Sequence, residues 1–271
     1  MNHPDIHTID DVIDSLENII KQTETENDPL GYFAVLYQKV TLKVKEGIET
    51  GYFDNGERME KLDVIFARRY IDAYFAWKEN KPVTLSWKQA FVISENKNLL
   101  VFQHLLLGMN AHINLDLGLA VAETATKDNI HLLKNDFIRI NEILSSLVSE
   151  VQHNLTSIWP MLKKILNVTG KADDFLVDFS MKIARNGAWD FANHMTLFRK
   201  TNWKEIIDSR DLRVSEKTRL ITNPGKWIQF LLWIIRLGER GSVKEKINQL
   251  KAYHPSVVPS GLTVSTNPEQ Q

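Results

Sequence analysis

The chain has 271 residues and a formal net charge of −1, with 43% hydrophobic and 25% charged residues, which is ordinary for a soluble globular protein. Lys+Arg (33) and Asp+Glu (34) nearly balance, so overall charge gives no reason to expect binding to nucleic acid or to an acidic membrane. Cysteine is absent, which excludes disulfides and thiolate sites, so any metal ligand must come from His, Asp, Glu or water.

The N-terminus lacks a basic region followed by a continuous apolar run, so it does not resemble a signal peptide. No stretch of about 18 apolar, uncharged residues predicts a transmembrane helix. We therefore expect a cytoplasmic protein without a transmembrane segment. The sequence does not indicate an oligomeric state.

Apolar residues at helical spacing predict three helices in the N-terminal third of the chain. The first runs from about Ile9 to Gln22. The second starts at Asp28-Pro29, a helix-initiating pair, and ends near Gly51. The third covers about Glu57 to Lys78. A short helix capped by Ser86 is expected to follow.

Arg69 falls inside the apolar face of the third predicted helix, and Asp72 lies at the edge of that face. A guanidinium group that points toward a core needs a carboxylate or several carbonyl groups as partners. Two interpretations remain open. Arg69 either forms a structural salt bridge or holds an anionic group in a pocket.

The most apolar long segment runs from about Asn98 to Thr126 and predicts a buried central helix. At 100° per residue, its polar residues fall into two stripes. One stripe contains His104, His112 and Asp116, and the other contains Gln103, Asn110 and Asn114. Buried polar groups cost about 1–3 kcal/mol each when unpaired, so these residues need core partners, a ligand, a metal or trapped water.

The next helices are expected over about Phe137 to Ile158 and from about Ala172 onward. The apolar face of the latter helix turns polar along its length. Its later members are Asn186, Asp190, Asn193 and His194. Such a break in a local pattern is typical of functional sites. Alternatively, the helix shifts near Gly187 and turns these residues to solvent.

Toward the C-terminus, short pieces and an Arg-bearing loop at 209–213 are expected. Asn223-Pro224 then opens an apolar helix to about Leu237, which fits a core helix better than a membrane span. Ser242 is expected to cap a last helix. The pattern as a whole predicts an all-α, single-domain bundle over residues 1–254, arranged around the central helix at about 98–126, with a flexible tail at 255–271.

Two pairs in this pattern suggest a site. His112-x-x-x-Asp116 and Asp190-x-x-x-His194 each place an imidazole and a carboxylate on adjacent turns of a helix. If the two helices meet, the four side chains form an N/O site of the kind that suits Zn, Fe or Mn. The alternative is a core histidine that is hydrogen-bonded to Asp116 or to a carbonyl group.

The segment LLLGMNAHINLDLGLA, with the upstream segments RRYIDAYFAW and SWKQAF, resembles a bacterial family of uncharacterised proteins that carries a domain-of-unknown-function label. The resemblance covers about Leu30 to Phe198 and implies an all-helical fold with no established activity. The chain also resembles, more faintly, the helical zinc-dependent phospholipases and nucleases, which place His-x-x-x-Asp on core helices. It lacks the further His-rich motifs and the N-terminal Trp of that family.

Two hypotheses of function follow. In the first, the protein is a metal-dependent hydrolase with a small-molecule substrate and a divalent metal. Its metal ligands are His112, Asp116, Asp190 and His194; its catalytic residues are His112, Asp116 and Arg69; its substrate-binding residues are Asn110, Asn114 and Asn193. In the second, the protein is a non-catalytic helical module that binds a ligand or a protein, and its buried polar residues are structural.

Overall fold

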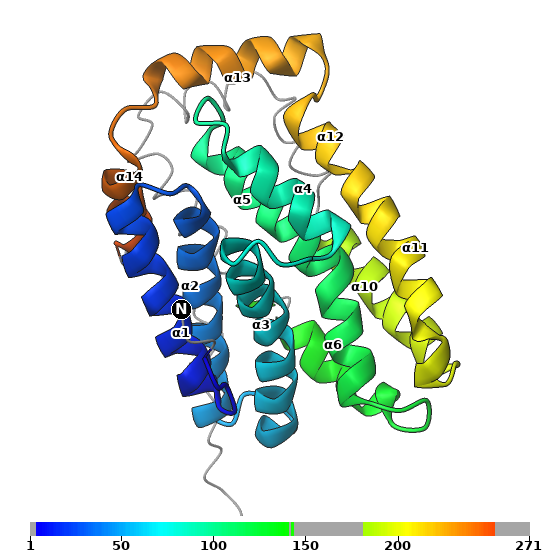
Figure 1. Cartoon of the computed structure of the whole chain (residues 1–271). Coiled ribbons are helices and arrows are strands. Elements are labelled where there is room, and N and C mark those ends of the chain that lie inside the picture. The colour runs from blue at the N-terminus through cyan, green and yellow to red at the C-terminus, as the bar shows by residue number, and fades with distance from the viewer. Residues whose placement is uncertain (1–3, 141, 144–180, 253–271) are drawn as a thin grey trace, which may run out of the picture.

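The computed structural model describes residues 4–140, 142–143 and 181–252, and all regular structure in these residues is helical (Figure 1). The predicted all-α fold is therefore confirmed. Most of the helix predicted at 137–158, the first half of the helix predicted from 172, and the predicted tail at 255–271 lie outside the described residues.

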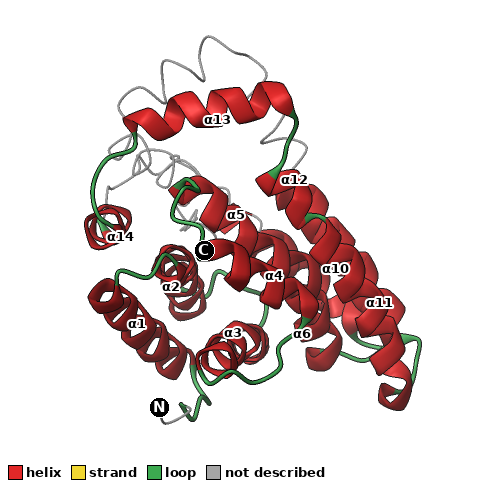
Figure 2. Cartoon of the chain, turned by 45° about the horizontal axis from the view of Figure 1, so that its top comes forward, coloured by secondary structure: helices red, strands yellow, loops and turns green. Residues whose placement is uncertain are grey.

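Helices α1 (Ile9–Glu26), α2 (Leu30–Glu49) and α3 (Gly56–Lys78) lie side by side and form one flank of the molecule (Figure 2). Local hydrogen bonds fix where they begin. Thr8 and Asp11 form a capping box at the start of α1, and Asn55 Oδ1 accepts the Arg58 N–H at the start of α3 (2.8 Å).

Helix α4 (Leu85–Ser94) leads into the central helix, which consists of α5 (Val101–Ala111), a π-helical turn (His112–Asp116) and α6 (Leu117–Thr124). The stretch Val101–Thr124 is long and apolar enough to cross a membrane by length and composition, but most of it is buried inside the bundle. The prediction of a buried central helix is therefore confirmed, while the π-helical turn was not predicted.

Helix α10 (Met181–Thr196) packs closely against α6 at Gly118. A side chain at this position would not fit, because its Cβ atom would lie 2.7 Å from the Phe191 ring. Helices α11 (Trp203–Glu216) and α12 (Thr218–Thr222) follow and pack against α4 and α5. The loop predicted at 209–213 is wrong, because this stretch is helical and Arg210 and Asp211 both have tertiary partners.

Helix α13 (Lys226–Gly238) crosses one end of the molecule between α12 and α14 (Val243–Lys251) in both views (Figures 1 and 2). Ser242 caps α14 through a capping box, as predicted. The prediction that α13 is a core helix is wrong, since none of its residues is buried.

The buried apolar side chains form two clusters. One spans α1 to α5 and includes Ala111, and the other includes Ile113, α6 and the described part of α10. Phe66 packs against both clusters. The π-helical turn thus lies where the two halves of the core meet.

Candidate functional site

The π-helical turn positions the residues at the centre of the site. The N–H of Leu117 donates to the carbonyl of His112, five residues earlier, instead of to the residue four earlier. Such turns are rare, and they are frequent at functional sites. Within this turn, the backbone carbonyl of Asn114 accepts a hydrogen bond from Arg210 Nε of α11 (2.9 Å).

His112 and Asp116 form a buried pair across this turn. The His112 Nδ1 to Asp116 Oδ2 distance is 3.1 Å, and Trp87 Nε1–H donates to the same oxygen at 2.8 Å. Burial lowers the pKa of His112, and the smaller effect of the Asp116 hydrogen bond opposes this shift, so the imidazole is neutral at pH 7. Since a carboxylate only accepts hydrogen bonds, Nδ1 carries the proton and Nε2 presents a lone pair.

Aromatic rings enclose this imidazole. Phe66 is stacked on it with a centroid distance of 3.6 Å and an interplanar angle of 5°. The ring of Tyr37 meets it edge-on at 4.5 Å. The rings of Phe33, Trp87 and Tyr70 lie at 5.8, 6.0 and 6.1 Å. We call these five side chains the aromatic cage.

Four polar atoms in and beside the cage are buried and have no hydrogen-bond partner among the described residues. They are His112 Nε2, Tyr37 Oη, Tyr70 Oη and Asp63 Oδ2. Native proteins pair nearly all buried polar atoms, so such a concentration requires an explanation. Unpaired polar groups inside an apolar enclosure are typical of a site for a small polar molecule, and His112 Nε2 and Tyr37 Oη belong to rings whose centroids lie only 4.5 Å apart.

Asp63 has an unusual carboxyl group. Burial, with a smaller contribution from Glu60, raises its pKa to about 7, so the acid is about half protonated at neutral pH. Burial also raises the pKa of Tyr37, and the charges of Asp63 and Asp116 contribute to this shift. Tyr37 therefore lies within electrostatic reach of both carboxyl groups.

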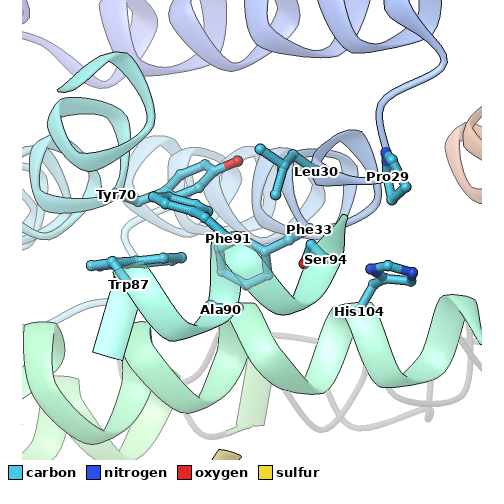
Figure 3. A pocket seen from close by; sticks show the side chains of 10 residues that line it. Pro29, Leu30, Phe33, Tyr70, Trp87, Ala90, Phe91, Ser94 and His104 are labelled. Atoms are coloured by element: carbon cyan, nitrogen blue, oxygen red, sulfur yellow. The ribbon is translucent and has the colours of Figure 1, made fainter. Parts of the chain in front are cut away.

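A cavity of about 10 Å³ adjoins the cage, which is roughly the space that one water molecule needs. Phe33, Tyr70 and Trp87 of the cage form part of its wall, and His104 lies toward the other end (Figure 3). Burial, together with the charges of Lys246 and Arg236, lowers the pKa of His104 to about 3, so this second imidazole is also neutral.

The predicted amide stripe has a structural role. Gln103 Nε2 donates to the carbonyl of Ile221 (3.0 Å), and Asn110 Nδ2 donates to the carbonyl of Val214 (2.9 Å). Asn114 Nδ2 donates to Asn110 Oδ1 (3.3 Å). These bonds attach α11 and α12 to the central helix, and both Asn110 and Asn114 have protein partners.

The structure does not bring the four predicted metal ligands together. Asp190 and His194 are exposed, whereas His112 and Asp116 are buried. In the described part of the chain, no three His, Asp or Glu side chains are placed to hold a metal ion. Asn193 donates to the Trp189 carbonyl of its own helix (2.8 Å).

Helix α10 therefore buries a different face from the one predicted. Its described buried residues are Arg185, Ala188, Phe191, Ala192 and Met195. Ile183, an apolar residue near the start of the helix, is 63% exposed. This outcome matches the alternative in which the polar residues turn to solvent.

Arg69 forms an ion pair with Glu123, which joins α3 to α6. The salt-bridge interpretation of Arg69 therefore fits the structure. Sequence reasoning missed Trp87, Tyr37 and Asp63 as site residues. A signal for Asp63 existed, because it follows Leu62 on the buried face of α3, where a carboxylate is out of place.

A family model matches residues 9–224, which include the whole cage and the π-helical turn. The chain belongs to the family of unknown function DUF5995. The expected membership of an uncharacterised family is thus confirmed, and the DUF5995 match ends before α13 begins. No curated protein and no solved structure matches the chain. The fainter resemblance to zinc-dependent phospholipases stays a prediction.

Proposed function

We propose that this protein binds a small uncharged molecule in the aromatic cage and holds it through a hydrogen bond to His112 Nε2. The observation that carries the proposal is this nitrogen itself, a buried acceptor without a partner among the described residues. Its opposite nitrogen is held by Asp116, so the lone pair is fixed in orientation.

The surroundings define the class of ligand. Flat aromatic walls favour an apolar body, and burial of a charge without a partner would be costly, so the ligand is uncharged. It carries a hydroxyl or N–H group for His112, and the Tyr37 hydroxyl, whose ring meets the imidazole at 4.5 Å, can donate to its acceptor atoms. Because the adjoining cavity is only about 10 Å³, a ligand larger than water enters by displacing cage side chains.

A second candidate function is proton-transfer catalysis at the same site. Burial lowers the pKa of His112 and raises that of Asp63, so a neutral base and a protonated acid are present together near neutral pH. The Tyr37 hydroxyl lies within electrostatic reach of Asp63 and of Asp116, the partner of His112. A metal-dependent hydrolase has less support. Its two predicted ligands on α10 are exposed while the two on the central helix are buried, and no three His, Asp or Glu side chains of the described residues are placed to hold a metal ion.

The proposal is tested with phenol, which joins an aromatic ring to a hydroxyl donor, and with toluene, which lacks the donor. We expect phenol to bind to the full chain more tightly than toluene, by titration calorimetry. His112→Phe keeps an aromatic ring but removes the acceptor, so it should abolish the preference for phenol. His194→Phe makes the same change at an exposed histidine and should leave the preference intact.

Long-range ¹H–¹⁵N correlation spectra supply a readout that does not depend on the probe. They should show His112 as a neutral imidazole with the proton on Nδ1. A proton on Nε2, or equal affinities for phenol and toluene in the unmodified chain, would contradict the proposal.

A further inference from the structure

Helix α13 is apolar on two opposite faces. Leu232 and Ile235 point inward and pack against the core cluster of α1 to α5. Phe230, Trp233 and Leu237 project from the opposite side and are 50%, 57% and 64% exposed. A surface helix normally needs only the inward stripe, so the outward stripe requires a separate explanation.

The outward face is mainly aromatic. The rings of Trp227, Phe230 and Trp233 follow one another along the helix, with centroid distances of 6.0 and 6.1 Å. Trp227 is itself 59% exposed. Tryptophan and phenylalanine on one face of a helix are typical of segments that lie in the headgroup region of a bilayer.

The charge around this helix is strongly positive. Residues 217–246 contain seven Lys or Arg residues and two Glu residues, although the whole chain has a net charge of −1. Glu239, one of the two acids, is buried and paired with Lys246 (2.6 Å). Lys226 at the start of α13 and Arg240 and Lys244 beyond its end are exposed. The exposed aromatic stripe is thus flanked by cations, which complements an anionic lipid surface.

The size of the stripe favours lipid over a second copy of the chain. At 1.5 Å per residue, a helix of 13 residues is about 20 Å long and about 10 Å wide. Two such faces packed together would bury well under the roughly 1,200 Å² that stable protein interfaces need. Shallow insertion into a bilayer does not require a minimum interface area, because each aromatic side chain that enters the headgroup region adds its own burial free energy.

We propose that α13 is a membrane-binding element, which inserts Trp227, Phe230, Trp233 and Leu237 into the headgroup region of an anionic bilayer while Lys226, Arg240 and Lys244 contact the lipid phosphates. The contact is peripheral, since the inward face of the helix stays on the protein core. The aromatic cage does not take part in this contact. The membrane proposal therefore does not depend on whether the cage binds a ligand.

Flotation of the full chain with vesicles on a density gradient tests the proposal. We expect binding to vesicles of phosphatidylcholine mixed with phosphatidylglycerol, and much weaker binding to phosphatidylcholine alone. The double substitution Phe230→Ser with Trp233→Ser should lower the bound-to-free ratio by at least about tenfold, given the burial free energy of aromatic side chains. Leu132→Ser removes a similarly exposed apolar residue from the helical turn Ile130–Leu133 and should have no effect.

A charge variant keeps the test decisive if the aromatic variant does not fold. Arg240→Glu with Lys244→Glu changes only exposed residues and should abolish the preference for phosphatidylglycerol. The proposal is overturned if the unmodified chain floats with neither vesicle, or if neither double variant changes its binding. It is also overturned if sedimentation shows a dimer that the aromatic variant dissociates, because the occupant of the face is then a second copy.

Discussion

Trp87→Phe measures what the hydrogen bond to Asp116 contributes to stability. The smaller ring keeps an aromatic contact with Phe91, whose centroid lies 5.2 Å from the indole, but it cannot donate to Asp116 Oδ2. A hydrogen bond to a charged group contributes about 1.5–3 kcal/mol. The lost ring volume adds on the order of 1 kcal/mol. We therefore expect the free energy of unfolding to fall by about 2.5–4 kcal/mol.

Trp203→Phe is the matched control. Trp203 is also buried, but its Nε1–H donates to neutral carbonyl groups, those of Met195 (3.1 Å) and Phe198 (3.3 Å). The same volume is lost, while the hydrogen bond contributes only about 0.5–1.5 kcal/mol. Urea unfolding followed by far-UV circular dichroism should show that Trp87→Phe costs about 1 kcal/mol more than Trp203→Phe. Equal costs for the two variants would refute the idea that Asp116 is a buried carboxylate held by Trp87.

Three further predictions concern the same core. Gly108→Ala should destabilise the fold by about 1–3 kcal/mol in urea, because its Cβ would lie 2.4 Å from the Phe33 ring; an unchanged midpoint would show that the ring moves freely. Asp63→Asn tests a pH effect: the folded-state pKa of about 7 exceeds the unfolded value of 3.8, so the folded state binds more protons between these values. The stability of the unmodified chain relative to Asp63→Asn should therefore fall as the pH rises from about 4 to 7, by up to about 1.4 kcal/mol per pH unit, and a flat difference would contradict the shift. Asp211→Ala should cost about 2 kcal/mol or more by the same urea measurement, because Asp211 accepts the first two backbone N–H groups of α4, and a loss below about 0.5 kcal/mol would mean that water replaces it.

The helix boundaries that local chemistry determines were predictable from the sequence. Ser242 caps α14 as expected, and Gly51 follows the end of α2 with a positive φ of 69°. These signals involve neighbours in sequence, so no tertiary information is needed to interpret them. The same holds for the first and third helices, whose apolar spacing gave their positions to within a few residues.

Tertiary contacts account for the parts that the sequence did not predict. The stretch at 209–213 looks like a polar loop, but Arg210 and Asp211 are satisfied by Asn114 and by the start of α4, so it is helical. The apolar sequence of α13 predicts burial of the helix. It does not reveal that the folded chain covers only one of its two apolar faces. The predicted buried face of α10 was wrong for a similar reason. The 3.6-residue spacing of apolar residues does not specify which helix packs against each face.

The candidate site was half predictable. The spacing of His112 and Asp116 correctly indicated a side-chain pair within one helix. The aromatic cage was not predictable, because Tyr37, Phe66 and Trp87 come from three other helices and look like ordinary core residues in sequence. The convergence of these rings on one imidazole is a property of the packing of α2, α3 and α4 around the central helix.

The π-helical turn also sets the rotational phase of the second half of the central helix. It holds one residue more than an α-helical turn, and one residue corresponds to a rotation of about 100°. Helix α6 is therefore rotated by about 100° from the position that an uninterrupted α-helix would give it. This rotation aims Gly118 at Phe191, where a side chain would not fit. An α-helical turn of the same five residues would rotate α6 by about 100° and turn Gly118 away from Phe191, so the π-helical turn aligns the two halves of the bundle.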